Sequence, residues 1–156
     1  MRSYDLDYLR QAIAVAAKAR ENGNHPFGAI LVDAEGRMIL EAENTVNTER
    51  DVTGHAETNL IRKASAAFPP EVLAGCTLYT STEPCAMCSG AIYWSGVSRV
   101  VYALGENSLA EFVRHLPGDD SLHLPCREVF ARGGRAIEVV GPLLEEEARM
   151  VHANFW

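Results

Sequence analysis

Two cysteines, Cys85 and Cys88, follow a proline one helical turn apart, and they constrain the fold of this chain more than any other feature. On a helix, residues three positions apart share a face, so the two thiols can bind one ion together. The pair needs a third ligand, and His55, at the start of another expected helix, is the best candidate. Helix N-termini gather at the carboxyl ends of the strands in parallel α/β folds. The fold that brings His55 to Cys85 is therefore one in which strands and helices alternate.

The hydrophobic pattern predicts this alternation along the chain. After an N-terminal helix, a hairpin of two strands is expected, and strands and helices then follow in turn. This order predicts a three-layer α/β/α sandwich around a mixed five-stranded sheet, with the N-terminal hairpin at its antiparallel edge. Helices are expected over residues 4–21, from about 55, over 85–95, 126–131 and 142–155, strands over 27–32, 38–43, 76–81, 99–104 and 136–140, and a loop over 116–125.

The length and composition fit one cytoplasmic domain. The chain has 156 residues, 47% of them hydrophobic, and we expect a single domain spanning residues 1–156. Its N-terminal residues mix charged and apolar side chains, and its apolar runs are far shorter than a membrane span, so no membrane partner is expected. In the reducing cytoplasm, the four cysteines are expected to be free thiols or metal ligands.

The charge balance argues against a nucleic-acid partner. The formal net charge is -7, and Lys18 and Lys63 are the only lysines. Proteins that bind the phosphate backbone depend on clustered lysine and arginine side chains. A small-molecule substrate therefore fits this chain better.

The residues around the cysteine pair favour a catalytic zinc site. Two thiolates and a neutral imidazole are ligands that suit zinc, and three protein ligands leave a fourth position for water. Glu57 follows His55 by two positions. In the middle of a helix, such residues point about 200° apart, but in the first turn both can reach past the helix end. Glu57 would then lie beside the water without binding the metal.

Residues 55–57 (His-Ala-Glu) and 84–88 (Pro-Cys-Ala-Met-Cys) resemble the H-x-E…P-C-x-x-C signature of zinc-dependent nucleobase and nucleoside deaminases of the cytidine deaminase-like superfamily. The resemblance implies hydrolytic deamination with Zn²⁺ as cofactor. Zinc lowers the pKa of its water from about 16 towards about 7. Glu57 would pass the proton of this water to a ring nitrogen and then help to protonate the departing amine. Members of the superfamily usually form homodimers, so the resemblance also implies a homodimer.

From residue 26 to about residue 104 the chain is most similar to bacterial guanine deaminases and, next, to tRNA adenosine deaminases. The aromatic pair at residues 93–94 resembles the guanine deaminases, which implies conversion of guanine to xanthine and ammonia. The match implies that Asn44, Phe27, Trp94 and Ala56 contact the substrate. Deamination of tRNA adenosine, or of cytosine, guanosine, a triazine or a pterin, would use the same chemistry and stays open.

Other interpretations of these residues also stay open. A structural zinc site would need a fourth protein ligand such as Cys76, although the start of an apolar strand favours a buried thiol there. His123 and Cys126 are also three apart, but Pro125 between them argues against a second metal site. The glutamates at 145–147 fit the first turn of a helix for dipole reasons alone. Residues 105–135 match the family poorly, and the aromatic residues at 155–156 are candidates for an interface.

Overall fold

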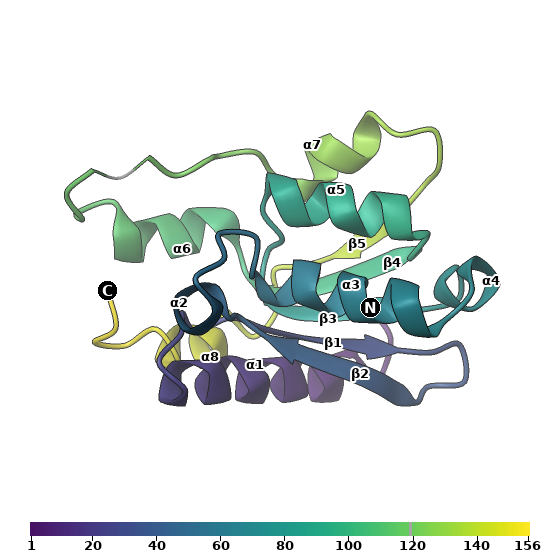
Figure 1. Ribbon diagram of the computed structural model, residues 1–156, viewed down its shortest axis with the longest axis horizontal. Coiled ribbons are helices and arrows are strands. Elements are labelled where there is room, and N and C mark those ends of the chain that lie inside the picture. The colour runs from purple at the N-terminus through teal and green to yellow at the C-terminus, as the bar shows by residue number, and fades with distance from the viewer. Residues whose placement is uncertain (119) are drawn as a thin grey trace.

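A mixed five-stranded sheet forms the centre of the computed structural model, which describes residues 1–118 and 120–156. Its strands are β1 (Gly28–Val32), β2 (Met38–Glu43), β3 (Thr77–Thr82), β4 (Arg99–Leu104) and β5 (Glu138–Val140). They lie in the order β2-β1-β3-β4-β5 (Figure 1). β1 pairs antiparallel with β2 and β3, whereas β3, β4 and β5 run parallel. The predicted mixed sheet with an antiparallel hairpin at its edge is confirmed.

Helices cover both faces of this sheet. One face carries α1 and α8, and the other carries α3, α5 and α7 (Figure 1). The predicted three-layer α/β/α sandwich is therefore confirmed. The bounds are α1 (Asp5–Glu21), α3 (Ala56–Ala67), α5 (Ala86–Ser95), α7 (Cys126–Ala131) and α8 (Glu145–Met150), with short helices α2 (Val46–Glu49) and α4 (Pro70–Leu73) in the connections.

The central strands bury side chains on both faces. Leu31 and Leu78 pack among the residues under α3 and α5, whereas their neighbours Ile30 and Tyr79 pack under α1. Successive side chains of a strand point to opposite faces, so a strand covered on both sides has an uninterrupted apolar sequence. This double cover leaves the ends of the strands as the place where polar side chains gather.

A buried ion pair fastens the start of α1 to the sheet. The Arg99 guanidinium donates to both carboxylate oxygens of Asp5 at 2.8 and 2.7 Å, and the Tyr79 hydroxyl donates to the same carboxylate at 2.7 Å. Burial alone would raise the pKa of Asp5, but these bonds and one from the backbone of Arg2 hold it well below its ordinary value. Asp5 is therefore a charged group inside the core with all its partners in place.

The C-terminal segment differs from the prediction of one helix over residues 142–155, which is wrong. α8 ends at Met150, and the chain continues in turns. Arg20 of α1 donates to the carbonyl oxygens of Val151 and Ala153 at 2.9 and 2.7 Å. The N-cap residue Leu144 has a φ of 55°, which marks a sharp entry into the helix. Tertiary contacts thus replace the helical pattern that the sequence favours locally.

Another difference lies after β4, where helix α6 (Glu106–Val113) forms in a region that matched no expected element. The loop expected over 116–125 shows neither helix nor strand at residues 116–118 and 120–125, and Asp119 lies outside the described residues. No helix within residues 1–118 and 120–156 is long and apolar enough to cross a membrane.

Candidate metal centre and active site

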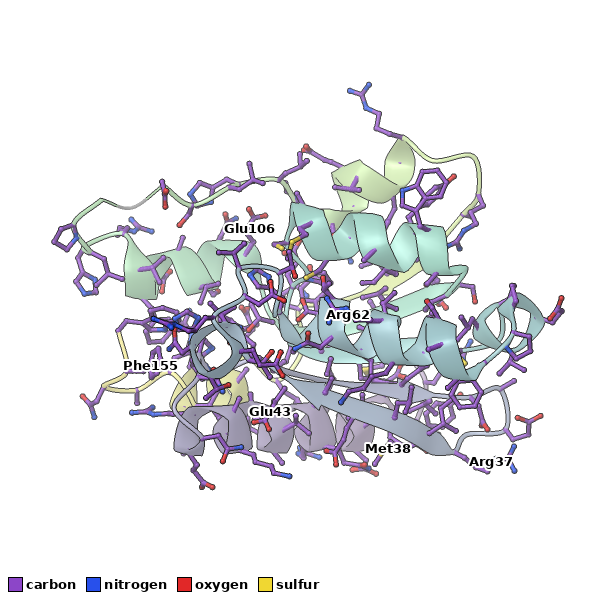
Figure 2. The ribbon with its side chains drawn as sticks, viewed as in Figure 1. Arg37, Met38, Glu43, Arg62, Glu106 and Phe155 are labelled. Atoms are coloured by element: carbon purple, nitrogen blue, oxygen red, sulfur yellow. The ribbon has the colours of Figure 1, made fainter. Side chains whose placement is uncertain are left out.

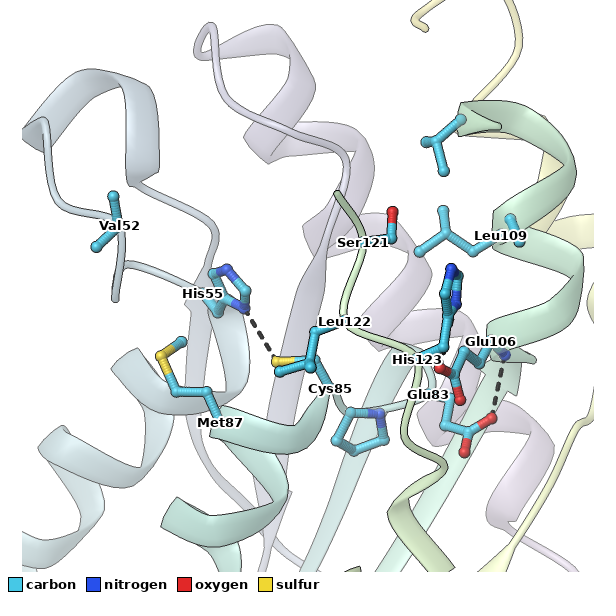
Figure 3. Close-up of a pocket in the computed structure, with 13 residues that line it drawn as sticks. Val52, His55, Glu83, Cys85, Met87, Glu106, Leu109, Ser121, Leu122 and His123 are labelled. Atoms are coloured by element: carbon cyan, nitrogen blue, oxygen red, sulfur yellow. Dashed lines mark hydrogen bonds and ion pairs between the residues drawn. The ribbon is translucent and has the colours of Figure 1, made fainter. Parts of the chain in front are cut away.

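The three predicted metal ligands come together between the first turns of two helices. His55 is the N-cap residue of α3, Cys85 is the N-cap residue of α5, and Cys88 lies in the first turn of α5. Their ligand atoms all lie within 4.8 Å of one another. Figure 3 shows the His55 ring facing the Cys85 sulfur. Both helix N-termini therefore direct partial positive charge at the site, which favours thiolates.

The distances between these ligand atoms fit a tetrahedral zinc ion. The His55 Nδ1 atom lies 3.5 Å from the Cys85 sulfur and 3.6 Å from the Cys88 sulfur. Zinc bonds of about 2.3 Å to sulfur and about 2.0 Å to nitrogen, at a tetrahedral angle, place these atoms about 3.5 Å apart. Within the described residues no fourth side chain joins this group. Cys76 instead bonds the carbonyl oxygen of Val72 at 3.3 Å, as expected for a buried core thiol.

Hydrogen bonds within the ligand group shift the pKa values of the two thiols in opposite directions. A hydrogen bond from Cys88, followed by one from His55, lowers the pKa of Cys85 to about 4 despite burial. The same bond to Cys85, together with burial, raises the pKa of Cys88. The bond to Cys85 also raises the pKa of His55. Zinc binds thiolates and neutral imidazole, so metal binding to these three residues is coupled to the release of protons. The Thr58 hydroxyl oxygen lies 3.2 Å from the Cys88 sulfur, and the hydrogen bond between these two atoms helps to orient that ligand.

Glu57 lies buried beside the ligand group without joining it. Its side chain is 6% exposed and sits in the first turn of α3. Burial, and next the charge on Cys85, raise the pKa of Glu57 to about 7. A carboxyl group with such a pKa can both accept and donate a proton near neutral pH. This is the property that the predicted proton transfer requires.

A cavity of about 340 Å³ opens beside His55 and Cys85. Figure 3 shows His55, Cys85 and Met87 on one side and Leu122 and His123 on the other. Its apolar lining comes mainly from α6 and from the segment that returns over the site. The residues that line it are Val52, His55, Glu83, Pro84, Cys85, Met87, Glu106, Leu109, Ala110, Val113, Ser121, Leu122 and His123.

Of the residues predicted to contact the base, Asn44 and Ala56 are buried, whereas Trp94 is exposed. Asn44 is 1% exposed and lies next to Phe27, whose carbonyl oxygen accepts a hydrogen bond from the Asn44 backbone at 3.1 Å. The Asn44 side-chain oxygen accepts from Val46 N at 3.1 Å, and its amide nitrogen donates to no atom of the described residues. Ala56 is fully buried in the first turn of α3, beside Glu57. Asn44 therefore presents a free donor.

Trp94 is not brought to the cavity of its own chain. It lies nine residues after Cys85, which is about 13 Å along a helix. Its ring is 83% exposed and contacts only the neighbouring Tyr93 ring, at 5.3 Å, among the ring pairs of the described residues. An exposed tryptophan on this face is available to a second molecule.

The C-terminal segment forms an aromatic group near the site. The Trp156 ring stacks on His25 with centroids 5.4 Å apart, and its indole nitrogen donates to His152 at 2.9 Å. Phe155, labelled in Figure 2, packs edge-on against His25 at 5.9 Å. Burial lowers the pKa of His25, and the charge on His55 lowers it further. The prediction left the role of this segment open.

Sequence reasoning missed the parts of the site that depend on distant partners. Glu83 accepts from the backbone of Glu106 at 3.1 Å and from that of Cys126 at 3.0 Å, so one carboxylate holds the first turns of α6 and α7. His123 pairs with Glu106 at 3.6 Å, and no metal group forms with Cys126 among the described residues. The apolar spacing of Leu109, Phe112 and Val113 was a readable helix signal for α6. The sequence contains no pattern that predicts the two backbone partners of Glu83.

Comparisons with known proteins agree with this geometry. Residues 2–104 match the family model described as the cytidine and deoxycytidylate deaminase zinc-binding region. The chain is 44% identical over 152 residues to the "probable cytosine deaminase" of Schizosaccharomyces pombe, covering 97% of this chain and 92% of that protein. It is 43% identical over 105 residues to the guanine deaminase of Bacillus subtilis, covering 67% of each. A structure from a study of A-to-I editing by tRNA:A34 deaminases superposes with a TM-score of 0.73 at 30% identity, covering 94% of this chain and 99% of that one.

Proposed function

The chain belongs to the cytidine and deoxycytidylate deaminase zinc-binding family, and we propose that it hydrolyses the exocyclic amino group of a free nucleobase. The observation that carries this proposal is the meeting of His55, Cys85 and Cys88 at zinc distances with the buried Glu57 beside them. A ligand set of three fits a catalytic metal, because structural zinc sites are closed by a fourth protein ligand.

The mechanism assigns one task to each group of residues. His55, Cys85 and Cys88 would hold zinc, which supplies a Lewis acid that lowers the pKa of water to about 7. Glu57, whose pKa is raised to about 7, takes a proton from the attacking water. It gives that proton to a ring nitrogen, then takes the proton of the new hydroxyl group and passes it to the amine, so that the carbon–nitrogen bond breaks, ammonia leaves and a carbonyl group forms. Asn44 directs its free amide nitrogen at an acceptor of the base and orients the ring for attack.

We propose cytosine as the preferred substrate. The sequence pattern favoured guanine, but that similarity ends near residue 104, before the residues of α6 that line the cavity. A relative that matches over 97% of this chain, and therefore over α6 as well, is the "probable cytosine deaminase" of S. pombe. Guanine is the second candidate, supported by 43% identity to the B. subtilis guanine deaminase. The net charge of -7 argues against tRNA.

The test is ammonia release by the zinc-loaded protein from cytosine, guanine, guanosine, adenine, a triazine, a pterin and tRNA, each at matched concentration. The proposal expects the highest kcat/KM with cytosine and a lower value with guanine. A reversed order restores guanine as the substrate, and activity on tRNA alone refutes the free-base proposal. Activity on none of these, with zinc bound, favours a structural zinc domain.

We further propose that the chain is a single domain that forms a homodimer in which Trp94 is covered. Tryptophan is enriched at the centre of protein–protein interfaces, and Trp94 is 83% exposed in the single chain. Light scattering behind size exclusion should give twice the mass of the chain, and Trp94→Glu should shift the protein towards the monomer. A wild-type protein that elutes as a monomer at micromolar concentration contradicts the proposed dimer.

A further inference from the structure

Asn59, a buried side chain of α3, contacts the backbone next to Asn44 and the backbone next to His55. Asn59 is 7% exposed and lies one turn after the start of α3. Its amide nitrogen donates to the carbonyl oxygen of Glu43 at 3.0 Å, to the Thr45 hydroxyl at 2.9 Å and to the carbonyl oxygen of Gly54 at 3.3 Å. One amide group therefore ties together two segments, residues 43–45 and residue 54, which are nine to eleven residues apart in sequence.

These contacts surround two residues with proposed roles. Glu43 and Thr45 flank Asn44, and Gly54 precedes His55. The backbone of Asn59 also donates to the carbonyl oxygen of His55 at 2.8 Å, as part of the first turn of the helix. The proposed base contact and the zinc ligand are thus held by the same side chain.

The orientation of the Asn59 amide is fixed from its other end. Arg62 extends from α3 (Figure 2) and donates to the Asn59 side-chain oxygen at 2.8 Å. An amide oxygen cannot donate, so this bond directs the nitrogen towards the three acceptors. The Thr45 backbone donates to Gly54 at 2.8 Å and draws the two ends of the connection together. A buried donor that loses its partners is strongly unfavourable, so the arrangement resists separation.

We propose that Asn59 is a positioning residue that sets the distance between Asn44 and His55, and with it the place of the base relative to the zinc ligands. This inference rests on the proposed function for the role of Asn44. The contacts of the Asn59 side chain with Glu43, Thr45 and Gly54, which we call the clamp, rest on the observed hydrogen bonds alone. Residues that orient a metal ligand from behind typically change metal affinity by about 10-fold to 100-fold when they are replaced.

The test is Asn59→Asp, which keeps the shape of the side chain and removes both donor hydrogens. We expect zinc affinity, measured by competition with a chelator, to fall about tenfold. We also expect kcat/KM for the preferred base to fall at least tenfold. Thr45→Val removes one acceptor at a partly exposed position, so it keeps the fold and should produce a smaller loss in kcat/KM, about threefold.

A double-mutant cycle with Asn44→Ala separates positioning from a general loss of structure. In the Asn44→Ala background, Asn59→Asp should reduce kcat/KM less than threefold, because the residue that it positions is already gone. Losses that multiply fully in the double variant would overturn the proposed link to Asn44. Wild-type zinc affinity and wild-type KM in Asn59→Asp would overturn the clamp as a whole.

Asn24 provides the matched control, because it is another buried asparagine beside the same connection. It is 2% exposed, and its side-chain oxygen accepts from the backbones of Asn47 and Thr48 at 3.1 Å each, without touching Asn44 or His55. Asn24→Asp keeps these acceptors and should change zinc affinity and kcat/KM less than twofold. A loss equal to that of Asn59→Asp contradicts a specific role. Without deaminase activity in the wild type the proposed function fails, while the zinc competition still decides whether Asn59 holds His55.

Discussion

At the level of single residues, the proposed mechanism depends on Glu57, the buried carboxyl group beside the ligand set. Glu57→Ala should reduce kcat with the preferred base by about 10²-fold to 10⁴-fold, the usual contribution of general acid and base catalysis. Zinc content should stay at the wild-type level, because Glu57 lies outside the ligand group. The measurement is turnover together with elemental analysis of the same sample. Turnover within threefold of the wild type would remove Glu57 from the mechanism.

Cys88 is fully buried between the two helices, and its sulfur is the third corner of the ligand set. Cys88→Ala should lose most of the bound zinc and all measurable turnover, since two ligands hold the ion poorly. Cys76→Ala is the control, because that thiol bonds a backbone carbonyl oxygen in the core. A zinc content unchanged by Cys88→Ala would show that another residue takes its place as ligand.

The sequence allowed the ligands and Glu57 to be predicted because their spacing follows from the geometry of a helix start. The roles of Asn59 and Glu83 were not predicted, because these roles depend on contacts between elements that lie apart in the sequence. Each holds backbone groups that belong to other elements, and their partners become visible only when the chain is folded. Trp94 was expected near the base from resemblance, and its position on α5 instead turns the ring towards solvent.

At the scale of the elements, Glu83 connects the loop before the cysteine pair to the helix that lines the cavity. Its carboxylate accepts backbone N–H groups at the first turns of α6 and α7, where a negative charge also interacts favourably with each helix dipole. Glu83→Ala should reduce the free energy of unfolding by about 1–3 kcal/mol, because each lost cap contributes about 0.5–2 kcal/mol. It should raise KM more than it lowers kcat, since α6 lines the cavity but carries no proposed catalytic group.

Urea unfolding and steady-state kinetics of the same Glu83→Ala sample test this prediction. Glu128→Ala is the control, because this glutamate lies in the first turn of α7 without touching Glu83's partners. Equal stability of the two variants, or a loss confined to kcat, would contradict the role of Glu83 as a common cap.

The elements were predictable where local pattern and tertiary contact agree. The strand over residues 99–104 and the helix over residues 126–131 form with the expected bounds. The last helix stops at Met150, and Arg20 binds the carbonyl oxygen of Val151, which a helix continuing to residue 155 would use. A local sequence pattern cannot predict such a competing contact from another helix. The helix signal of α6 was present, but it stood in a segment that resembled no known motif.

At the scale of the whole molecule, the pair of Asp5 and Arg99 links the first helix to the centre of the sheet. Breaking such a buried pair typically costs about 3–5 kcal/mol, because one charge stays buried without its partner. Asp5→Ala should therefore destabilise the fold by about that amount in urea unfolding at pH 7. Asp7→Ala is the control, because that neighbouring carboxylate is exposed and, among the residues that the structure describes, forms only a surface ion pair with Arg10 at 3.6 Å.

The same pair predicts how stability depends on pH. The pKa of Asp5 in the folded protein lies below the value of about 3.9 for an unfolded aspartate. Its contribution is therefore complete above that unfolded value and is lost as the pH falls towards the folded pKa. Unfolding measured from pH 7 down to pH 3 should show a smaller slope for Asp5→Ala than for the wild type. Equal slopes would show that other carboxylates dominate acid unfolding.

Three metal ligands and one buried carboxyl group are proposed to make this fold a zinc-dependent deaminase, and a zinc titration of the metal-free protein tests this proposal. Protein stripped of metal by a chelator is titrated with Zn²⁺ while ammonia release from cytosine is followed. We predict no release before addition, a linear rise to one zinc per chain, and no rise in Glu57→Ala at the same zinc content. Release that is independent of zinc, or that reaches within threefold of the wild-type rate in Glu57→Ala, would contradict the proposed mechanism.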